Sequence, residues 1–183
     1  RLYKNVKGRR VYLSISNFKN LIKLIKKIYI EFLFLVLLGA LSSLSLPPFN
    51  YLVINFFTFT FFFVFLMKKS EPIKANKIFF LYGWFFGFGY FLSSLYWVSI
   101  SLSFDQNYKH LVPFTVIFLP ALLGVFYGFI SFFFKILKTK NVLSSFFIFS
   151  LIFGIIEFVR GSIFTGFPWN LIAYSFTTNL EVL

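Results

Sequence analysis

Residues 142–169 read VLSSFFIFSLIFGIIEFVRGSIFTGFPW, and this stretch decides the fold. Its first part, 142–159, is apolar and has nearly the length that a helix needs to cross a bilayer, about 20 residues. Its second part is rich in glycine and ends with proline and tryptophan, residues typical of a turn at a membrane interface. The stretch therefore predicts a membrane-spanning helix that ends in a turn over residues 160–170.

Glu157 and Arg160 place opposite charges three residues apart near the end of this span. Side chains at that spacing share a helix face and can form an ion pair, and a charge at the edge of the hydrocarbon is tolerated when it is paired. Two roles fit this pair. It fixes the end of the helix and the start of the turn, or it lines a pocket for a charged lipid head group, because the planar guanidinium binds phosphate through two parallel hydrogen bonds.

The turn after the pair combines residues that shape the backbone with residues suited to the head-group region. Glycine gives freedom of φ, proline fixes the next step, and aromatic side chains anchor a segment at the interface. The candidate lipid-binding residues are Glu157, Arg160, Thr165, Phe167 and Trp169, and the structural residues of the turn are Gly161, Gly166 and Pro168.

Four more apolar runs precede this span in a chain of 183 residues that is 59% hydrophobic and 25% aromatic. The sequence thus predicts an all-α membrane protein, a polytopic helical bundle with about five transmembrane helices. Small residues four apart, such as Gly83 and Gly87, are expected to let helices pack closely. We expect a transmembrane domain over 28–183 with spans at about 28–46, 51–67, 78–103, 111–134 and 142–159.

The basic residues alternate between the connections of these spans. Of 18 Lys and Arg, sixteen fall in the first 27 residues and in the connections 68–77 and 135–140. The positive-inside rule then predicts a cytoplasmic N-terminus and an extracytoplasmic turn at 160–170. Because the net charge of +13 is explained by membrane orientation and no folded polar domain carries it, we expect a membrane partner and no nucleic acid.

Residues 1–27 hold nine of the basic residues, and apolar residues recur at helical spacing from Phe18 to Ile28. This pattern indicates a basic amphipathic helix on the anionic cytoplasmic leaflet, with a solvated charged tail as the alternative. Glu31 follows one helical turn after Lys27, which predicts an ion pair at the interface.

The chain contains no cysteine and one histidine, His110. In these residues, this excludes disulfides, thiolate metal sites and a thiol nucleophile, and one histidine alone cannot build a histidine-based metal site, so no cofactor or metal is expected. The chain begins at Arg1 and stops at Leu183, from which we expect a fragment of a longer protein. A transporter or channel subunit and a membrane anchor for another enzyme are the alternative functions, although Glu31 and Glu157 lie near span ends rather than at mid-depth, where ion paths place acids.

Three motifs occur in a characteristic order: Leu46-Pro-Pro-Phe49, then Gly87-Phe-Gly89 with Tyr96-Trp97-Val98, then Glu157-x-x-Arg160-Gly161-x-x-x-Thr165-Gly166-Phe167-Pro168-Trp169. On these motifs the chain resembles the N-terminal membrane part of the bacterial apolipoprotein N-acyltransferases, over about residues 28–183. The resemblance implies a multi-pass protein of the bacterial plasma (inner) membrane. It also implies two partners, a phospholipid acyl donor and a diacylglyceryl-lipoprotein acceptor.

The resemblance implies a reaction whose nucleophile lies elsewhere. Members of that family carry a nitrilase-like domain with a Glu-Lys-Cys triad, whose Cys takes an acyl chain as a thioester and passes it to the N-terminal diacylglyceryl-cysteine of a lipoprotein. That catalytic domain is missing from these 183 residues, which contain no Cys. No catalytic residue is therefore assigned in this chain, and the fragment alone is expected to be inactive.

Overall fold

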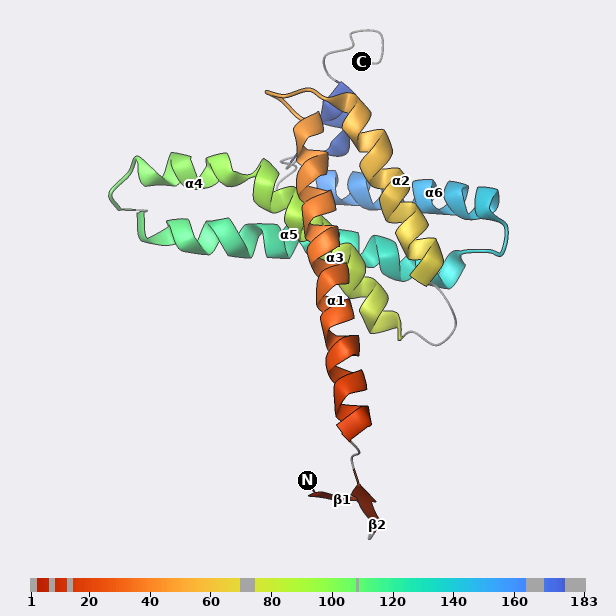
Figure 1. Cartoon of the computed structure of the whole chain (residues 1–183). Helices are drawn as coiled ribbons and strands as arrows, with labels where there is room; N and C mark the ends of the chain where they lie inside the picture. The colour runs from red at the N-terminus through yellow and green to blue at the C-terminus, as the bar shows by residue number, and fades with distance from the viewer. Residues whose placement is uncertain are drawn as a thin grey trace.

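A computed structural model describes residues 3–6, 9–12, 15–69, 75–107, 109–163 and 170–176. Helices dominate these residues (Figure 1). The elements in order are β1 (Tyr3–Val6), β2 (Arg9–Tyr12), α1 (Ile15–Ser42), the 3-10 helix η1 (Ser43–Ser45), α2 (Leu52–Lys69), α3 (Asn76–Ser94), α4 (Tyr96–Ser103), the 3-10 helix η2 (Lys109–Leu111), α5 (Val112–Leu137), α6 (Val142–Ser162) and the 3-10 helix η3 (Ile172–Phe176).

Four helical stretches of the described residues are each long and apolar enough to cross a membrane. Four stretches meet that test by length and composition: Ile25–Ser45, Leu52–Lys69, Lys109–Leu137 and Val142–Ser162. A fifth span is formed if α3 and α4 are taken together, although they are bent by 43° at their junction. The predicted fold class, a helical membrane protein with about five spans, is confirmed.

Two parts of the chain differ from the segments expected above. The expected span 78–103 is broken at Leu95, whose φ of −110° and ψ of 8° separate α3 from α4. The expected amphipathic helix is not a separate element, because α1 runs from Ile15 without a break into the first span. Before it, β1 and β2 form an antiparallel hairpin in which Tyr3 pairs with Tyr12.

Close backbone contacts bring α3 against both α1 and α5. A Cβ built on Gly39 of α1 would lie 1.9 Å from the carbonyl oxygen of Phe86, so no side chain fits there. On the other side of α3, a Cβ on Gly83 would lie 2.0 Å from the carbonyl oxygen of Tyr127. Small residues therefore let the helices approach, as the Gly83 and Gly87 pattern predicts.

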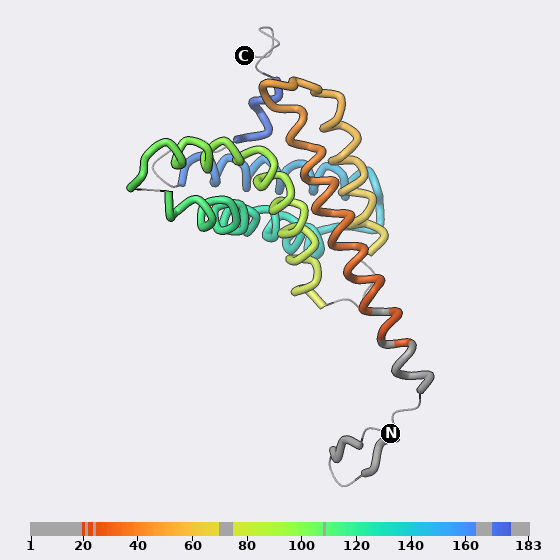
Figure 2. The backbone as a smooth tube through the Cα atoms, turned by 60° about the vertical axis from the view of Figure 1, so that its left-hand side comes forward, coloured from red at the N-terminus to blue at the C-terminus, as the bar shows by residue number. Residues whose placement is uncertain are grey.

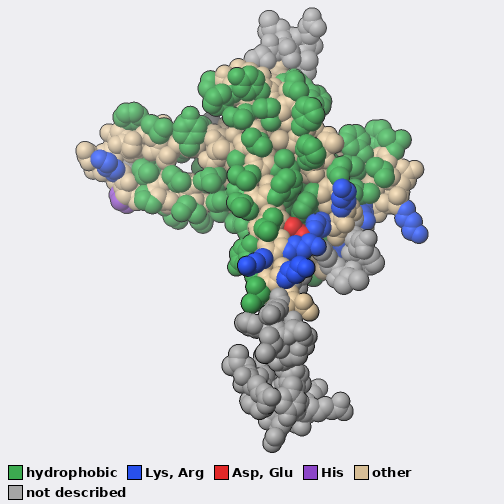
Figure 3. Space-filling model, in the orientation of Figure 1, with side chains coloured by type: hydrophobic (Ala, Val, Ile, Leu, Met, Phe, Trp, Pro, Cys, Tyr) green, Lys and Arg blue, Asp and Glu red, His purple; other side chains and the backbone are tan. Residues whose placement is uncertain are grey.

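The two ends of the bundle differ in chemistry. At the end that we call the lysine end, where α2 finishes and α3 begins, Glu31 is buried and accepts hydrogen bonds from Lys69 Nζ and, at 2.6 Å, from Tyr82 Oη. Sequence spacing assigned Lys27 to Glu31, but α2 brings Lys69 to it from 38 residues away. Figure 3 shows a group of Lys and Arg side chains beside an acidic side chain near this end of a mostly hydrophobic surface, with further basic side chains at the left and right edges of the view.

The opposite end, which we call the proline end, holds the connection between α1 and α2. This connection contains η1 and the sequence Pro47-Pro48, whose peptide bond is cis. The segment η3 lies beside the end of α1 and the start of α2 (Figure 2). Asn55 of α2 donates to Ser175 Oγ of η3 at 3.3 Å, so the chain after α6 returns to this end of the bundle.

Candidate functional site

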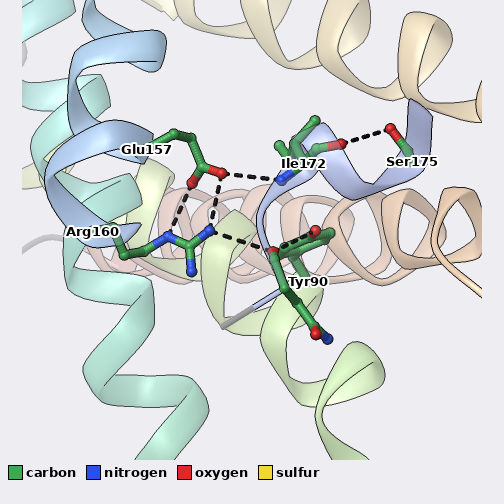
Figure 4. A network of polar contacts seen from close by, with 6 residues as sticks. Tyr90, Glu157, Arg160, Ile172 and Ser175 are labelled. Carbon is green, nitrogen blue, oxygen red and sulfur yellow. Dashed lines mark hydrogen bonds and ion pairs between the residues drawn. The ribbon is translucent and has the colours of Figure 1, made fainter. Parts of the chain in front are cut away.

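The side chains of Glu157 and Arg160 meet at the end of α6, as their spacing predicts. Arg160 Nε lies 3.0 Å from Glu157 Oε1, and Arg160 Nη2 lies 2.9 Å from Oε2, which makes a two-point ion pair (Figure 4). Arg160 is only 1% exposed. Its guanidinium also lies over the ring of Phe91, 4.9 Å from the ring centre. Such fork-like pairing fixes the orientation of both groups as well as their charge.

Asn170 connects this pair to α3. Its carbonyl oxygen accepts from Arg160 Nη2 at 3.3 Å and from Tyr90 Oη at 3.0 Å. Its side-chain Nδ2 donates at 2.8 Å to the carbonyl of Ser94, the last residue of α3. A carbonyl at a helix end has no partner within its own helix, so the break at Leu95 is what leaves the Ser94 oxygen for Asn170. The backbone of Asn170 is left-handed, with φ of 39°.

Glu157 also holds the start of η3. The backbone N–H of Ile172 donates to Glu157 Oε2 at 3.1 Å, and Ser175 Oγ donates to the Ile172 carbonyl at 2.7 Å (Figure 4). We call the set Tyr90, Ser94, Glu157, Arg160, Asn170 and Ile172 the Arg160 cluster. Its hydrogen bonds join α3, α6 and η3 into one unit.

A pocket of about 420 Å³ opens beside this cluster at the proline end. The turn 46–49 forms one wall, and residues on both sides of the α3–α4 break form another. The lining residues are Ser43, Leu46, Pro47, Pro48, Phe49, Ser93, Ser94, Tyr96, Trp97, Asn170 and Tyr174. We call this cavity the proline pocket.

Polar and apolar groups converge in the proline pocket. Trp97 and Tyr96 are 44% and 57% exposed, which suits aromatic side chains at a membrane interface. Ser94 Oγ is buried and has no hydrogen-bond partner among the described residues. The lining of the proline pocket is thus mixed, with polar groups and apolar side chains in similar measure.

Part of the predicted site lies outside the described residues. Thr165, Gly166, Phe167, Pro168 and Trp169 belong to this part. Gly161 is described, and it lies inside α6 rather than in the turn, because the helix continues to Ser162. A Cβ on Gly161 would lie 3.2 Å from the side chain of Leu171, so this glycine makes room for the segment that follows the turn.

Sequence reasoning missed the partners that complete the site. Asn170 directly follows the last motif, and an asparagine in that place is a known signal for left-handed backbone. Tyr90 and Ser94 carried no signal of their own, since their partner is about 80 residues away in the chain. In the part of the chain that the structure describes, no group of three His, Asp or Glu side chains could hold a metal ion.

Comparison with known proteins agrees with these features. The family profile described as Apolipoprotein N-acyltransferase N-terminal domain matches residues 38–183. Similar proteins named apolipoprotein N-acyltransferase occur in Brucella melitensis, with 36% identity over 144 residues and 75% of this chain, and in Rickettsia typhi, with 37% identity over 145 residues and 77% of this chain. The protein of that name in Rhizobium rhizogenes is 33% identical over 146 residues, or 76% of this chain. The matched region spans 27% of the length of each of these relatives.

Proposed function

This chain belongs to the apolipoprotein N-acyltransferase family, and from that premise we propose that it is the membrane part of an enzyme that acylates lipoproteins. The proposed reaction moves an acyl chain from a phospholipid to the N-terminal diacylglyceryl-cysteine of a lipoprotein. Both proposed substrates are held in the membrane by acyl chains. Such a reaction requires a membrane part that binds both substrates from within the bilayer. That part must also hold their polar groups together at one surface of the membrane.

The proline pocket is the observation that carries this proposal. Residues from the first two motifs, which are about 50 positions apart, line one cavity, and Asn170 next to the third motif completes it. Its place at the end of the spans, with exposed aromatic side chains at its edge, supports a role in receiving the polar part of a lipid substrate.

Within this proposal, Glu157 and Arg160 are positioning residues. Because the Arg160 side chain is buried and bonded to Glu157 and Asn170, it supports the wall of the pocket rather than binding a phosphate itself. Thr165, Phe167 and Trp169 stay candidate lipid-binding residues on the strength of the sequence.

Acyl transfer tests the proposed function directly. The complete product of the gene that encodes this chain is purified and mixed with phospholipid and a diacylglyceryl lipopeptide. The triacylated lipopeptide that forms is measured by mass spectrometry. We expect transfer by that protein and none by residues 1–183 alone, which contain no cysteine to carry the acyl chain. Absence of transfer together with solute flux in liposomes would instead favour a transporter.

Trp97→Ala tests the pocket. We expect kcat/KM for acyl transfer to fall on the order of tenfold, the effect of losing roughly 1.4 kcal/mol of substrate contact. Phe104→Ala is the matched control, because Phe104 is an exposed aromatic residue at the end of α4 that does not line the pocket. Equal kinetics for the two variants at normal expression would contradict a role of the pocket in substrate binding.

A further inference from the structure

The lysine end of the bundle carries a concentration of positive charge that has no part in the proposed reaction. Lysines from four helices gather there, and Figure 3 shows basic side chains grouped beside an acidic one near this end. They are Lys27 on α1, one turn before Glu31, Lys68 and Lys69 at the end of α2, Lys77 in the first turn of α3 and Lys135 in the last turn of α5. We call this set of lysines the lysine surface.

An aromatic layer holds two lysines of this surface in place. Lys69 Nζ lies 5.5 Å from the centre of the Phe65 ring. Lys135 Nζ lies 5.0 Å from the centre of the Phe79 ring. The ring of Tyr82 joins these two rings, with centroids 5.0 Å from Phe65 and 5.7 Å from Phe79. Because an ammonium group is attracted to the face of an aromatic ring, the lysines of α2 and α5 are positioned on one layer of rings from α2 and α3.

Negative charge is scarce at the lysine surface. Glu31 is the only acidic side chain among the described residues at this end, and it already accepts hydrogen bonds from Lys69 and Tyr82. Lys68 and Lys77 are exposed. Lys77 also lies in the first turn of α3, where the helix dipole disfavours a positive charge and where no acidic residue balances it. The surface therefore has an excess of positive charge that an anion from outside the described residues would balance.

Membrane orientation alone does not account for this arrangement. The positive-inside rule depends on how many Lys and Arg residues lie near the ends of the spans, and lysines spread over the solvent satisfy it equally well. Here Lys69 and Lys135, from spans that are not consecutive in the chain, lie over one aromatic layer. Clusters of about four to eight basic residues at the end of a membrane helix are typical of sites for anionic lipids. The arrangement thus indicates a binding surface.

The position of the lysine surface favours a phospholipid over a soluble anion. Lys68, Lys77 and Lys135 lie in the last or first turns of membrane helices, the depth at which lipid phosphates are found. Exposed apolar side chains adjoin them, with Val64 on α2 and Ile136 on α5 being 37% and 55% exposed. A phospholipid offers a phosphate to the lysines and acyl chains to the apolar side chains, whereas a soluble anion or a nucleic acid offers charge alone.

From the excess charge, the aromatic layer and the depth of the lysines, we propose that the lysine surface binds the head group of an anionic phospholipid. A zwitterionic head group is a poorer match, because it brings an ammonium group of its own and balances no net charge. This lipid is distinct from the acyl donor of the proposed reaction, since the lysine surface and the proline pocket share no residue and lie at opposite ends of the bundle.

Lipid binding by the complete product of the gene that encodes this chain tests the proposal without reference to acyl transfer. The protein is purified in a neutral detergent and titrated with phosphatidylglycerol or with phosphatidylcholine of the same acyl chains, and native mass spectrometry gives the Kd of each lipid. We expect phosphatidylglycerol to bind more tightly. The difference should shrink as the ammonium acetate concentration is raised, because salt screens exposed charges.

Lys68→Gln and Lys77→Gln should each raise the Kd for phosphatidylglycerol about fivefold, and the double variant should raise it further. Both side chains are exposed, so the fold tolerates their replacement. Lys69 is left unaltered, because its loss would leave buried Glu31 without its ion-pair partner.

Lys109→Gln is the matched control, because Lys109 is an exposed lysine of η2 outside the lysine surface. It removes the same charge and should leave both Kd values unchanged. Trp97→Ala, at the proline pocket, should keep the preference for phosphatidylglycerol. Four results would each overturn the proposal: equal Kd values for the two lipids, an unchanged preference in the folded double variant, loss of the preference in Lys109→Gln or Trp97→Ala, or displacement of the lipid by soluble glycerol phosphate.

Discussion

Arg160 shows what a charge requires when its side chain is shielded from solvent and lipid. Two oxygens of Glu157, the carbonyl of Asn170 and the ring of Phe91 surround its guanidinium. A buried pair of this kind offsets its own desolvation only when geometry and extra hydrogen bonds are good. Removing one partner is costly because the other charge then stays buried alone. The Arg160 and Glu157 pair thus holds the chain after α6 in place, through hydrogen bonds to Asn170 and Ile172.

We expect Arg160→Ala to destabilise the protein by about 3–5 kcal/mol, because Glu157 loses its partner. Arg160→Lys should restore only part of this stability, since an ammonium cannot pair with both carboxylate oxygens in the same fork. The double variant Glu157→Gln/Arg160→Gln should be more stable than Arg160→Ala, because it leaves no unpaired charge. Unfolding in detergent, followed by circular dichroism, measures all three.

Lys109→Ala serves as the control for loss of a positive charge, since Lys109 is exposed. It should leave the unfolding transition in place. A folded Arg160→Ala protein of normal stability that binds phospholipid weakly would contradict the positioning role and favour direct contact with a head group.

At the scale of helices, α3 depends on backbone contact with both of its neighbours. We expect Gly39→Ala and Gly83→Ala each to destabilise the bundle by about 1–3 kcal/mol or to prevent folding, because a Cβ at either place would overlap a backbone oxygen that cannot move aside. Gly154→Ala is the matched control on α6, where a Cβ meets open space. The yield of monodisperse protein and its thermal unfolding in detergent report the difference. Similar behaviour of all three variants would show that close packing at α3 is not required.

Helix–helix contacts were partly readable from the sequence. Gly83 and Gly87 gave a local signal, since small residues four apart mark a packing face. Gly39 gave none, because it stands alone in an apolar run and its partner, Phe86, comes from another span. The break at Leu95 was not predicted either, because neither proline nor glycine marks it. Asn170, which binds the freed Ser94 carbonyl, is 76 positions further along the chain. Local spacing predicts pairs within one helix, such as Glu157 with Arg160, but not partners that only the fold brings together.

At the scale of the whole molecule, the two ends of the bundle differ: one carries buried Glu31 with lysines, and the other carries the proline pocket. Lys69 and Lys135 lie at the lysine end, where Glu31 binds Lys69 and the ring of Phe79 lies 5.0 Å from Lys135 Nζ. The proline pocket and η3 lie at the other end. If the lysine end faces the cytoplasm, as the positive-inside rule predicts, the proline pocket opens at the outer face. The orientation of the chain therefore determines the side of the membrane on which the proline pocket opens, and one experiment tests both.

Single cysteines test this orientation, because residues 1–183 contain no cysteine of their own. We expect Asn107→Cys, between α4 and η2, to react in intact cells with a maleimide that does not cross the membrane. Thr139→Cys, between α5 and α6, should react only after the membrane is opened, since it lies in a lysine-rich connection that the rule places inside. Both positions are exposed, so burial does not explain a difference between them. The reverse pattern would place the proline pocket on the cytoplasmic side, where it could not act on lipids of the outer leaflet, and the proposed function would lose its structural support.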